Sequence, residues 1–94
     1  MSSVSTPDYG AEILARIIQP EYGHMTAEAA REVLEYKLTA DDRDRVNELA
    51  AKAREGSLLD EERFELDEYE RVTALVEIMQ SKARVSLTLA GLSP

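Results

Sequence analysis

The stretch that decides the fold is the carboxyl-terminal half of the chain, which reads TADDRDRVNELAAKAREGSLL over residues 39–59 and DEERFELDEYERVTALVEIMQSKARVSLTLA over residues 60–90. The second part contains neither Gly nor Pro, so no residue in it breaks a helix. A helix of that length spans about 45 Å. Because a compact chain of this size has a radius of gyration of about 12 Å, we expect part of the long helix to extend beyond its neighbours.

The first part of this stretch carries the signals of a shorter helix over about residues 40–55. Thr39 and Asp42 have the spacing of a capping box, and Gly56 is the residue type that ends helices in the left-handed conformation. Residues 57–59 leave room only for a tight connection, so the sequence predicts an antiparallel helical hairpin. The apolar positions recur with the spacing of one buried face: Val46, Leu49, Ala50 and Ala53.

Two shorter helices are predicted in the amino-terminal half, over about residues 7–18 and 27–38. The first follows Thr6-Pro7, an N-cap residue and a proline at the first helical position. Thr26 is a capping residue for the second. We therefore predict an all-α fold in which two short N-terminal helices pack on a helical hairpin whose second arm is a long C-terminal helix.

The composition is that of one small domain. Hydrophobic residues make up 44% and charged residues 32% of the 94 residues, a balance that supports a packed core. We expect residues 1–6 to be a disordered tail, residues 7–90 to form a single helical domain, and residues 91–94 to be a second tail.

The chain has no cysteine, which permits a reducing compartment, and the cytoplasm is the expected location. The first six residues have neither the basic region nor the apolar run of a signal peptide. No window approaches the roughly 20 apolar residues of a membrane span, so no membrane association is expected.

Acidic residues are concentrated in one segment. The formal net charge is −8, and residues 55–70 alone hold eight acidic residues against one arginine. Such a negative field repels the phosphate backbones of DNA and RNA, so direct nucleic-acid binding is not expected. Glu61, Glu65 and Glu68 share one helix face. Together with Glu62 they form a candidate docking face for a basic protein partner.

Residues that could carry catalysis or hold a metal ion do not form a recognisable pattern. His24 is the only histidine and lacks a second base or ligand. Asp42 and Asp44 have the first spacing of a calcium loop. The glycine and bidentate-acid positions of that loop, however, hold Asn47 and Ala53. The sequence therefore predicts no catalytic, metal or cofactor site, and no enzyme.

The long helix carries two apolar rows. The first follows a spacing of three and four residues and is assigned to the domain's own core: Leu66, Tyr69, Val72 or Thr73, Val76, Met79, Ala83 and Leu87. The second row needs a partner and consists of Leu75, Ile78, Val85 and Leu89. Lys82 and Arg84 lie in the same region and could form intermolecular ion pairs with the acidic segment, as in an antiparallel homodimer.

The hairpin also carries a family resemblance. The sequence ADDRDRVNELAAKAREGSL at 40–58, with EE at 61–62, ELDEYERV at 65–72 and QSKAR at 80–84, resembles a group of short, functionally uncharacterised bacterial proteins that share this pattern. The resemblance is close over residues 40–87 and loose over 11–38.

Genes of that group often lie beside a gene for an HNH-type nuclease, so the resemblance implies a partner or antitoxin-like role with a nuclease or toxin. Leu59 stands where the group has Thr or Ser. For that reason we expect the start of the long helix to shift toward Ser57, whose spacing to Asp60 again satisfies the capping pattern.

Two functions are compatible with these features. The first is a non-catalytic protein-binding module, an acidic accessory or antitoxin-like partner of a larger bacterial protein. The alternative is a self-associating structural protein that forms a homodimer through the long C-terminal helix.

Overall fold

The computed structural model describes residues 9–93, which form four helices and no strand. The helices are α1 (Tyr9–Ile18), α2 (Ala27–Leu34), α3 (Ala40–Glu55) and α4 (Asp60–Leu89). The predicted all-α fold is therefore confirmed for these residues. The expected tail at 1–6 and the expected cap at Thr6-Pro7 lie outside the described residues.

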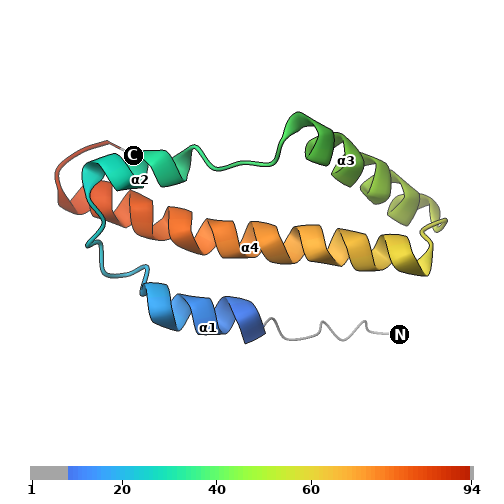
Figure 1. The fold of residues 1–94 in the computed structure, drawn as a ribbon, viewed down its shortest axis with the longest axis horizontal. Helices are drawn as coiled ribbons and strands as arrows, with labels where there is room; N and C mark the ends of the chain where they lie inside the picture. The colour runs from blue at the N-terminus through green and yellow to red at the C-terminus, as the bar shows by residue number, and fades with distance from the viewer. Residues whose placement is uncertain (1–8, 94) are drawn as a thin grey trace.

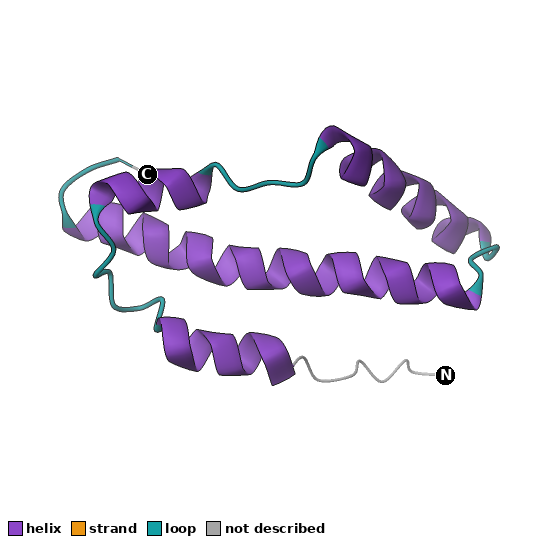
Figure 2. Cartoon of the chain, in the orientation of Figure 1, coloured by secondary structure: helices purple, strands orange, loops and turns teal. Residues whose placement is uncertain are grey.

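Helix α4 is the axis of the molecule, and the other three helices lie along it (Figure 1). Within residues 9–93, α1, α2 and α3 each contact α4 but do not contact one another. Figure 2 shows α1 on one side of α4 and α2 followed by α3 on the other. The molecule measures 48 × 28 × 17 Å. The molecule is therefore elongated, with its longest extent nearly three times its shortest.

The ends of α3 follow the predicted signals. Thr39 Oγ1 accepts a hydrogen bond from the Asp42 amide at 3.1 Å, and it donates one to Asp42 Oδ2 at 2.8 Å. At the other end, Gly56 adopts φ +71°, and the Ser57 amide donates to the Lys52 carbonyl at 3.0 Å. This arrangement closes the last turn of the helix and directs the chain back along α4.

Helix α4 begins at Asp60, so the expected shift toward Ser57 is wrong. Leu59 occupies the N-cap position with extended dihedral angles, but its side chain has no acceptor. Instead, Glu62 Oε1 reaches back and accepts a hydrogen bond from the Leu59 amide at 3.1 Å. Glu62, the acidic residue of the capping box, thus caps the start of α4 without a side-chain acceptor at the N-cap. The Ser57 hydroxyl does not cap α4 and instead donates to the Lys52 carbonyl.

Helix α2 ends at Leu34, four residues before its predicted end. A tertiary contact accompanies this end, because Gln80 Nε2 on α4 donates to the carbonyls of Val33 at 3.2 Å and Tyr36 at 2.9 Å. These bonds satisfy backbone groups that would otherwise continue the helix. Residues 36–39 therefore form a linker that leads into the Thr39 cap.

The main core lies at the carboxyl-terminal end of α4. Ala30, Ala83 and Leu87 are fully buried, and partly buried hydrophobic residues from α2 and the preceding loop pack against them. The assignment of Ala83 and Leu87 to the core row is confirmed. Leu49 of α3 is also fully buried but does not belong to this cluster. The chain thus has one small core and a separate buried leucine in the hairpin.

The loop between α1 and α2 crosses the backbone of α4 at Gly23. A Cβ atom added at this position would lie 2.8 Å from both the Cα and the amide nitrogen of Ser86, and 2.9 Å from the carbonyl carbon of Val85. Just beyond, the Met25 amide donates to the Ser86 hydroxyl at 3.1 Å. Only glycine permits an approach this close, and the crossing fixes the path from α1 to α2.

We expect Gly23→Ala to lower the free energy of unfolding by about 1–3 kcal/mol, because the added methyl group meets backbone atoms that cannot rotate away. Urea denaturation followed by circular dichroism measures the change. Glu21→Ala, an exposed position in the same loop, is the control. Equal stability of the Gly23→Ala variant and the wild type would contradict the close crossing.

Candidate functional site

Two of the four acidic candidate residues, Glu62 and Glu65, form ion pairs within the α3–α4 hairpin. Glu62 is only 9% exposed, and its Oε2 atom accepts a hydrogen bond from Lys52 Nζ at 2.5 Å. Glu65 forms a bidentate pair with Arg45, with Nε and Nη2 at 2.8 and 2.7 Å from the two carboxylate oxygens. Arg45 therefore holds α3 and α4 together by a pair with fixed geometry.

The polar contacts of the hairpin are nested around the turn. The Lys52–Glu62 pair is innermost, the Arg45–Glu65 pair follows, and a hydrogen bond from the Tyr69 hydroxyl to Asp42 Oδ1 at 2.7 Å is outermost. Antiparallel helices bring residues together in this order. The contacts join the whole length of α3 to the first third of α4. We call these three pairs the hairpin clamp.

The contacts of the hairpin clamp shift the pKa values of Glu62, Glu65, Asp42 and Tyr69. The Lys52 ammonium group lowers the pKa of Glu62, and the amide of Leu59 lowers it further. The Arg45 guanidinium group lowers the pKa of Glu65 in the same way. The hydrogen bond between Tyr69 and Asp42 lowers the pKa of the carboxyl group and raises the pKa of the phenol. Each shift favours the charge state that the clamp requires.

The other two acidic candidates remain at the surface. Glu61 is exposed, and no ion pair or hydrogen bond engages its side chain within residues 9–93. Glu68 is half-buried and accepts a hydrogen bond from Arg71 Nη1, one turn along α4, at 2.9 Å. Of the four acidic candidates, Glu61 is the one whose carboxylate is both exposed and unpaired in the described part.

The two basic candidates have different surroundings. Lys82 Nζ donates a hydrogen bond to the carbonyl of Ile18, the last residue of α1, at 2.5 Å. A cation at the end of a helix also interacts favourably with the helix dipole, so Lys82 holds α1 against α4. Arg84 is exposed, and no ion pair in the described part of the chain engages it.

The second apolar row of α4 is partly buried within the chain. Leu75, Ile78 and Val85 are half-buried, whereas Leu89 is 69% exposed. Lys82 lies on the same face as Ile78 and Val85, at spacings of four and three residues, and its contact with Ile18 places α1 there. Three of the four residues of the second row are therefore partly shielded from solvent by the chain itself.

Covering this row leaves a different apolar row exposed. On α1, Leu14 and Ile18 are half-buried, but Tyr9, Ile13 and Ile17 are 66%, 48% and 71% exposed. The three exposed residues are four positions apart and lie on one side of the helix.

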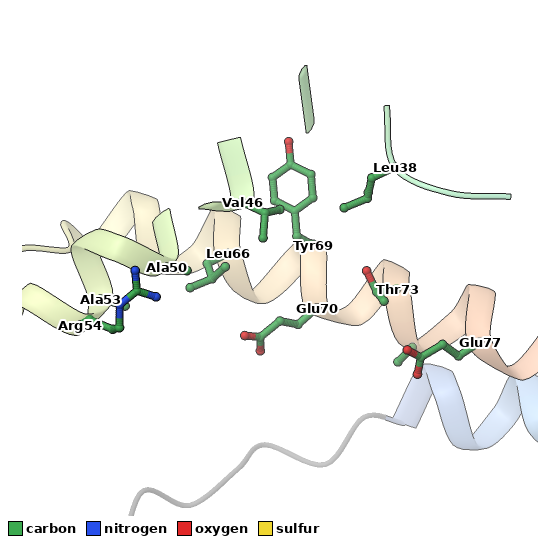
Figure 3. A pocket seen from close by; sticks show the side chains of 11 residues that line it. Leu38, Val46, Ala50, Ala53, Arg54, Leu66, Tyr69, Glu70, Thr73 and Glu77 are labelled. Atoms are coloured by element: carbon green, nitrogen blue, oxygen red, sulfur yellow. The ribbon is translucent and has the colours of Figure 1, made fainter. Parts of the chain in front are cut away.

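An open groove lies between α3, the linker and α4 (Figure 3). Its volume is about 530 Å³. In Figure 3 the Tyr69 ring rises from α4 beside Leu38, with the side chains of α3 on one flank. A smaller hollow of about 340 Å³ shares Leu38 and Tyr69 and lies beside Val72. Apolar or small side chains form much of the larger groove: Leu38, Val46, Ala50, Leu66, Tyr69 and Thr73.

None of the candidate partner-binding residues lines the larger groove, because the sequence pattern assigned Leu66, Tyr69 and either Val72 or Thr73 to the core. A signal for the groove was present in α3. Its inner face ends in Ala50 and Ala53, whose side chains are too small to fill the space opposite a long helix. Glu65 and Glu68 do line the smaller hollow.

Within residues 9–93, no group of three or more His, Asp or Glu side chains is placed to hold a metal ion. The His24 ring stacks on Tyr22, with ring centroids 6.1 Å apart. Among the helices that the structure describes, none combines the length and apolar character needed to cross a membrane. No protein-family model matches the chain, and no curated protein or solved structure matches it.

The hairpin clamp predicts a specific dependence on pH. Because the folded-state pKa of Glu62 is below its ordinary value of 4.5, its stabilising effect is complete above that value and is lost as the pH falls through the folded-state pKa. We expect Glu62→Gln to lower the melting temperature at pH 7, and this difference to shrink as the pH falls below 4.5. Glu61→Gln is the control. A difference that persists unchanged at low pH would contradict the clamp.

The contact between Lys82 and α1 predicts a local effect. Lys82→Met keeps the aliphatic stem and removes the donor to Ile18, so amide hydrogen exchange in α1 should accelerate about fivefold while exchange in α3 is unchanged. Arg84→Met removes an exposed cation from the same region and should leave α1 unaffected. Equal exchange rates in the Lys82→Met variant and the wild type would show that this contact does not hold α1.

Proposed function

We propose that this chain is a non-catalytic protein-binding module, an acidic accessory or antitoxin-like partner of a larger protein. The observation that carries the proposal is the apolar surface that the fold leaves open. Four hydrophobic residues are fully buried, two of them alanines, whereas ten large hydrophobic side chains are exposed in the described part. Apolar surface that a chain leaves exposed marks a binding site where its residues lie together, as Tyr9, Ile13 and Ile17 do on one side of α1.

The negative net charge of the chain favours a basic protein partner. With a net charge of −8, the chain attracts basic surfaces and repels acidic ones. Along α4, Asp60, Glu61, Asp67 and Glu70 are exposed. The sequence resemblance implies a nuclease or toxin as the larger protein, and a cleft that binds phosphate groups is a basic surface that would suit this charge.

The alternative is a homodimer formed through α4. The observation that favours it is the exposure of Phe64 and Leu89 on α4, at 68% and 69%, together with Val72 at 49%. In an antiparallel symmetric dimer, Phe64 of one chain would lie near Leu89 of the other. The pairing would also bring together two chains that each carry a charge of −8, which opposes association at low salt.

The proposed function predicts a monomer that forms a salt-sensitive complex. Sedimentation equilibrium should give a mass near 10.5 kDa at micromolar concentrations. The tagged chain should retain a protein partner from the cells that express it. Raising the ionic strength from about 0.05 to about 0.5 M should weaken that complex, because salt screens exposed charges. A dimer at micromolar concentration without a retained partner would favour the alternative.

A further inference from the structure

The groove between α3 and α4 has dimensions that suit a third helix. The hairpin clamp holds α3 at both its ends, and the remaining space has a volume of about 530 Å³. Its lining extends along α4 from Leu66 to Glu77, which is about 17 Å of helix axis, or three turns. Amphipathic helices commonly bind in such grooves between helices.

The lining is shaped for close packing. Ala50 and Ala53 on α3 and Ala74 on α4 contribute small side chains, and all three are half-buried. Small side chains allow the backbone of an incoming helix to approach closely. Val46 and Leu66 are also half-buried, so an apolar face laid against them would remove their remaining surface from water.

The rim of the groove on α4 is negative. Glu70 and Glu77 are exposed, and neither has an ion-pair or hydrogen-bond partner within residues 9–93. They are seven residues apart, so they lie on one face of α4 with a separation of about 10.5 Å along the axis. Glu62 and Glu65, by contrast, are neutralised by the hairpin clamp. Among the acidic residues that line the groove, Glu70 and Glu77 therefore carry charge that is available to a partner.

We infer that this groove binds an amphipathic helix of a partner protein, with its apolar face against α3 and α4 and two basic residues seven positions apart on its flank. The inference rests on the proposed function and names the surface and the chemistry of its partner. The basic residues pair with Glu70 and Glu77. Arg54, the cation that lines the α3 side of the groove, favours a neutral or acidic residue on the opposite flank of the helix.

A second copy of the chain fits the groove less well. The exposed apolar row of α1 consists of Tyr9, Ile13 and Ile17 and is a helix face of suitable length. The charged residues of α1, however, are Glu12 and Arg16, one of each sign. This helix cannot present two cations to the rim.

The test uses two synthetic amphipathic helical peptides of about 18 residues, long enough to form helices on binding. One has a leucine face flanked by lysines seven positions apart, and its twin has glutamates in place of the lysines. Fluorescence anisotropy with labelled peptides should show binding of the lysine peptide only. Amide shifts in NMR spectra should change for Val46, Ala50 and Thr73.

A charge-reversed variant, Glu70→Lys/Glu77→Lys, should weaken binding of the lysine peptide about tenfold. The matched control, Glu35→Lys/Asp67→Lys, changes the net charge equally at exposed positions outside the groove and should bind within about twofold of the wild type. All four substituted positions are exposed. Circular dichroism confirms that both variants retain their helices.

Several outcomes would overturn the inference. Equal weakening in both double variants would mean that binding follows net charge alone. Shift changes confined to Ile13 and Ile17 would assign the peptide to α1. Self-association abolished by Glu70→Lys/Glu77→Lys would assign the groove to a second copy. A cellular partner retained equally by this variant and the wild type would preserve the proposed function and refute the groove, whereas no partner retained by either would refute the proposed function.

Discussion

The architecture depends on one constraint, the length of α4 relative to everything that can cover it. This helix has 30 residues, whereas α1, α2 and α3 have 10, 8 and 16. Each shorter helix packs on a different part of α4, and in the described part none contacts another. A core enclosed on all sides therefore cannot form. Among the hydrophobic residues of 9–93, burial is complete only at Ala30, Ala83, Leu87 and the isolated Leu49.

Where apolar packing is thin, polar contacts define the arrangement. Surface ion pairs contribute little to stability individually, but a bidentate pair such as Arg45–Glu65 restricts the orientation of the two helices that it joins. Gly23, Gln80 and Lys82 have the same role at the other end of α4, where they position the loop, α2 and α1. The acidic segment is therefore partly structural, because Glu62 and Glu65 hold the hairpin while Glu61, Asp67 and Glu70 remain exposed.

Local signals in the sequence predicted the elements well, because they depend on short-range geometry. The Thr39 cap and the Gly56 terminus gave α3 its observed limits, and the lack of Gly and Pro gave α4 its length. The errors came from contacts between distant residues. Gln80 stops α2 at Leu34, a bond that no pattern within residues 27–38 reveals.

The candidate site was less predictable for the same reason. Periodicity separated two rows on α4 but could not show that Leu75, Ile78 and Val85 would be partly buried within the chain. Nor could it show that Leu66 would border an open groove. The elongated shape of the molecule also affects how its mass is measured. A 48 × 28 × 17 Å particle diffuses more slowly than a sphere of equal mass and leaves a gel-filtration column early. Calibrated against globular standards, a single chain would be mistaken for a larger species, so its stoichiometry requires a method that is independent of shape.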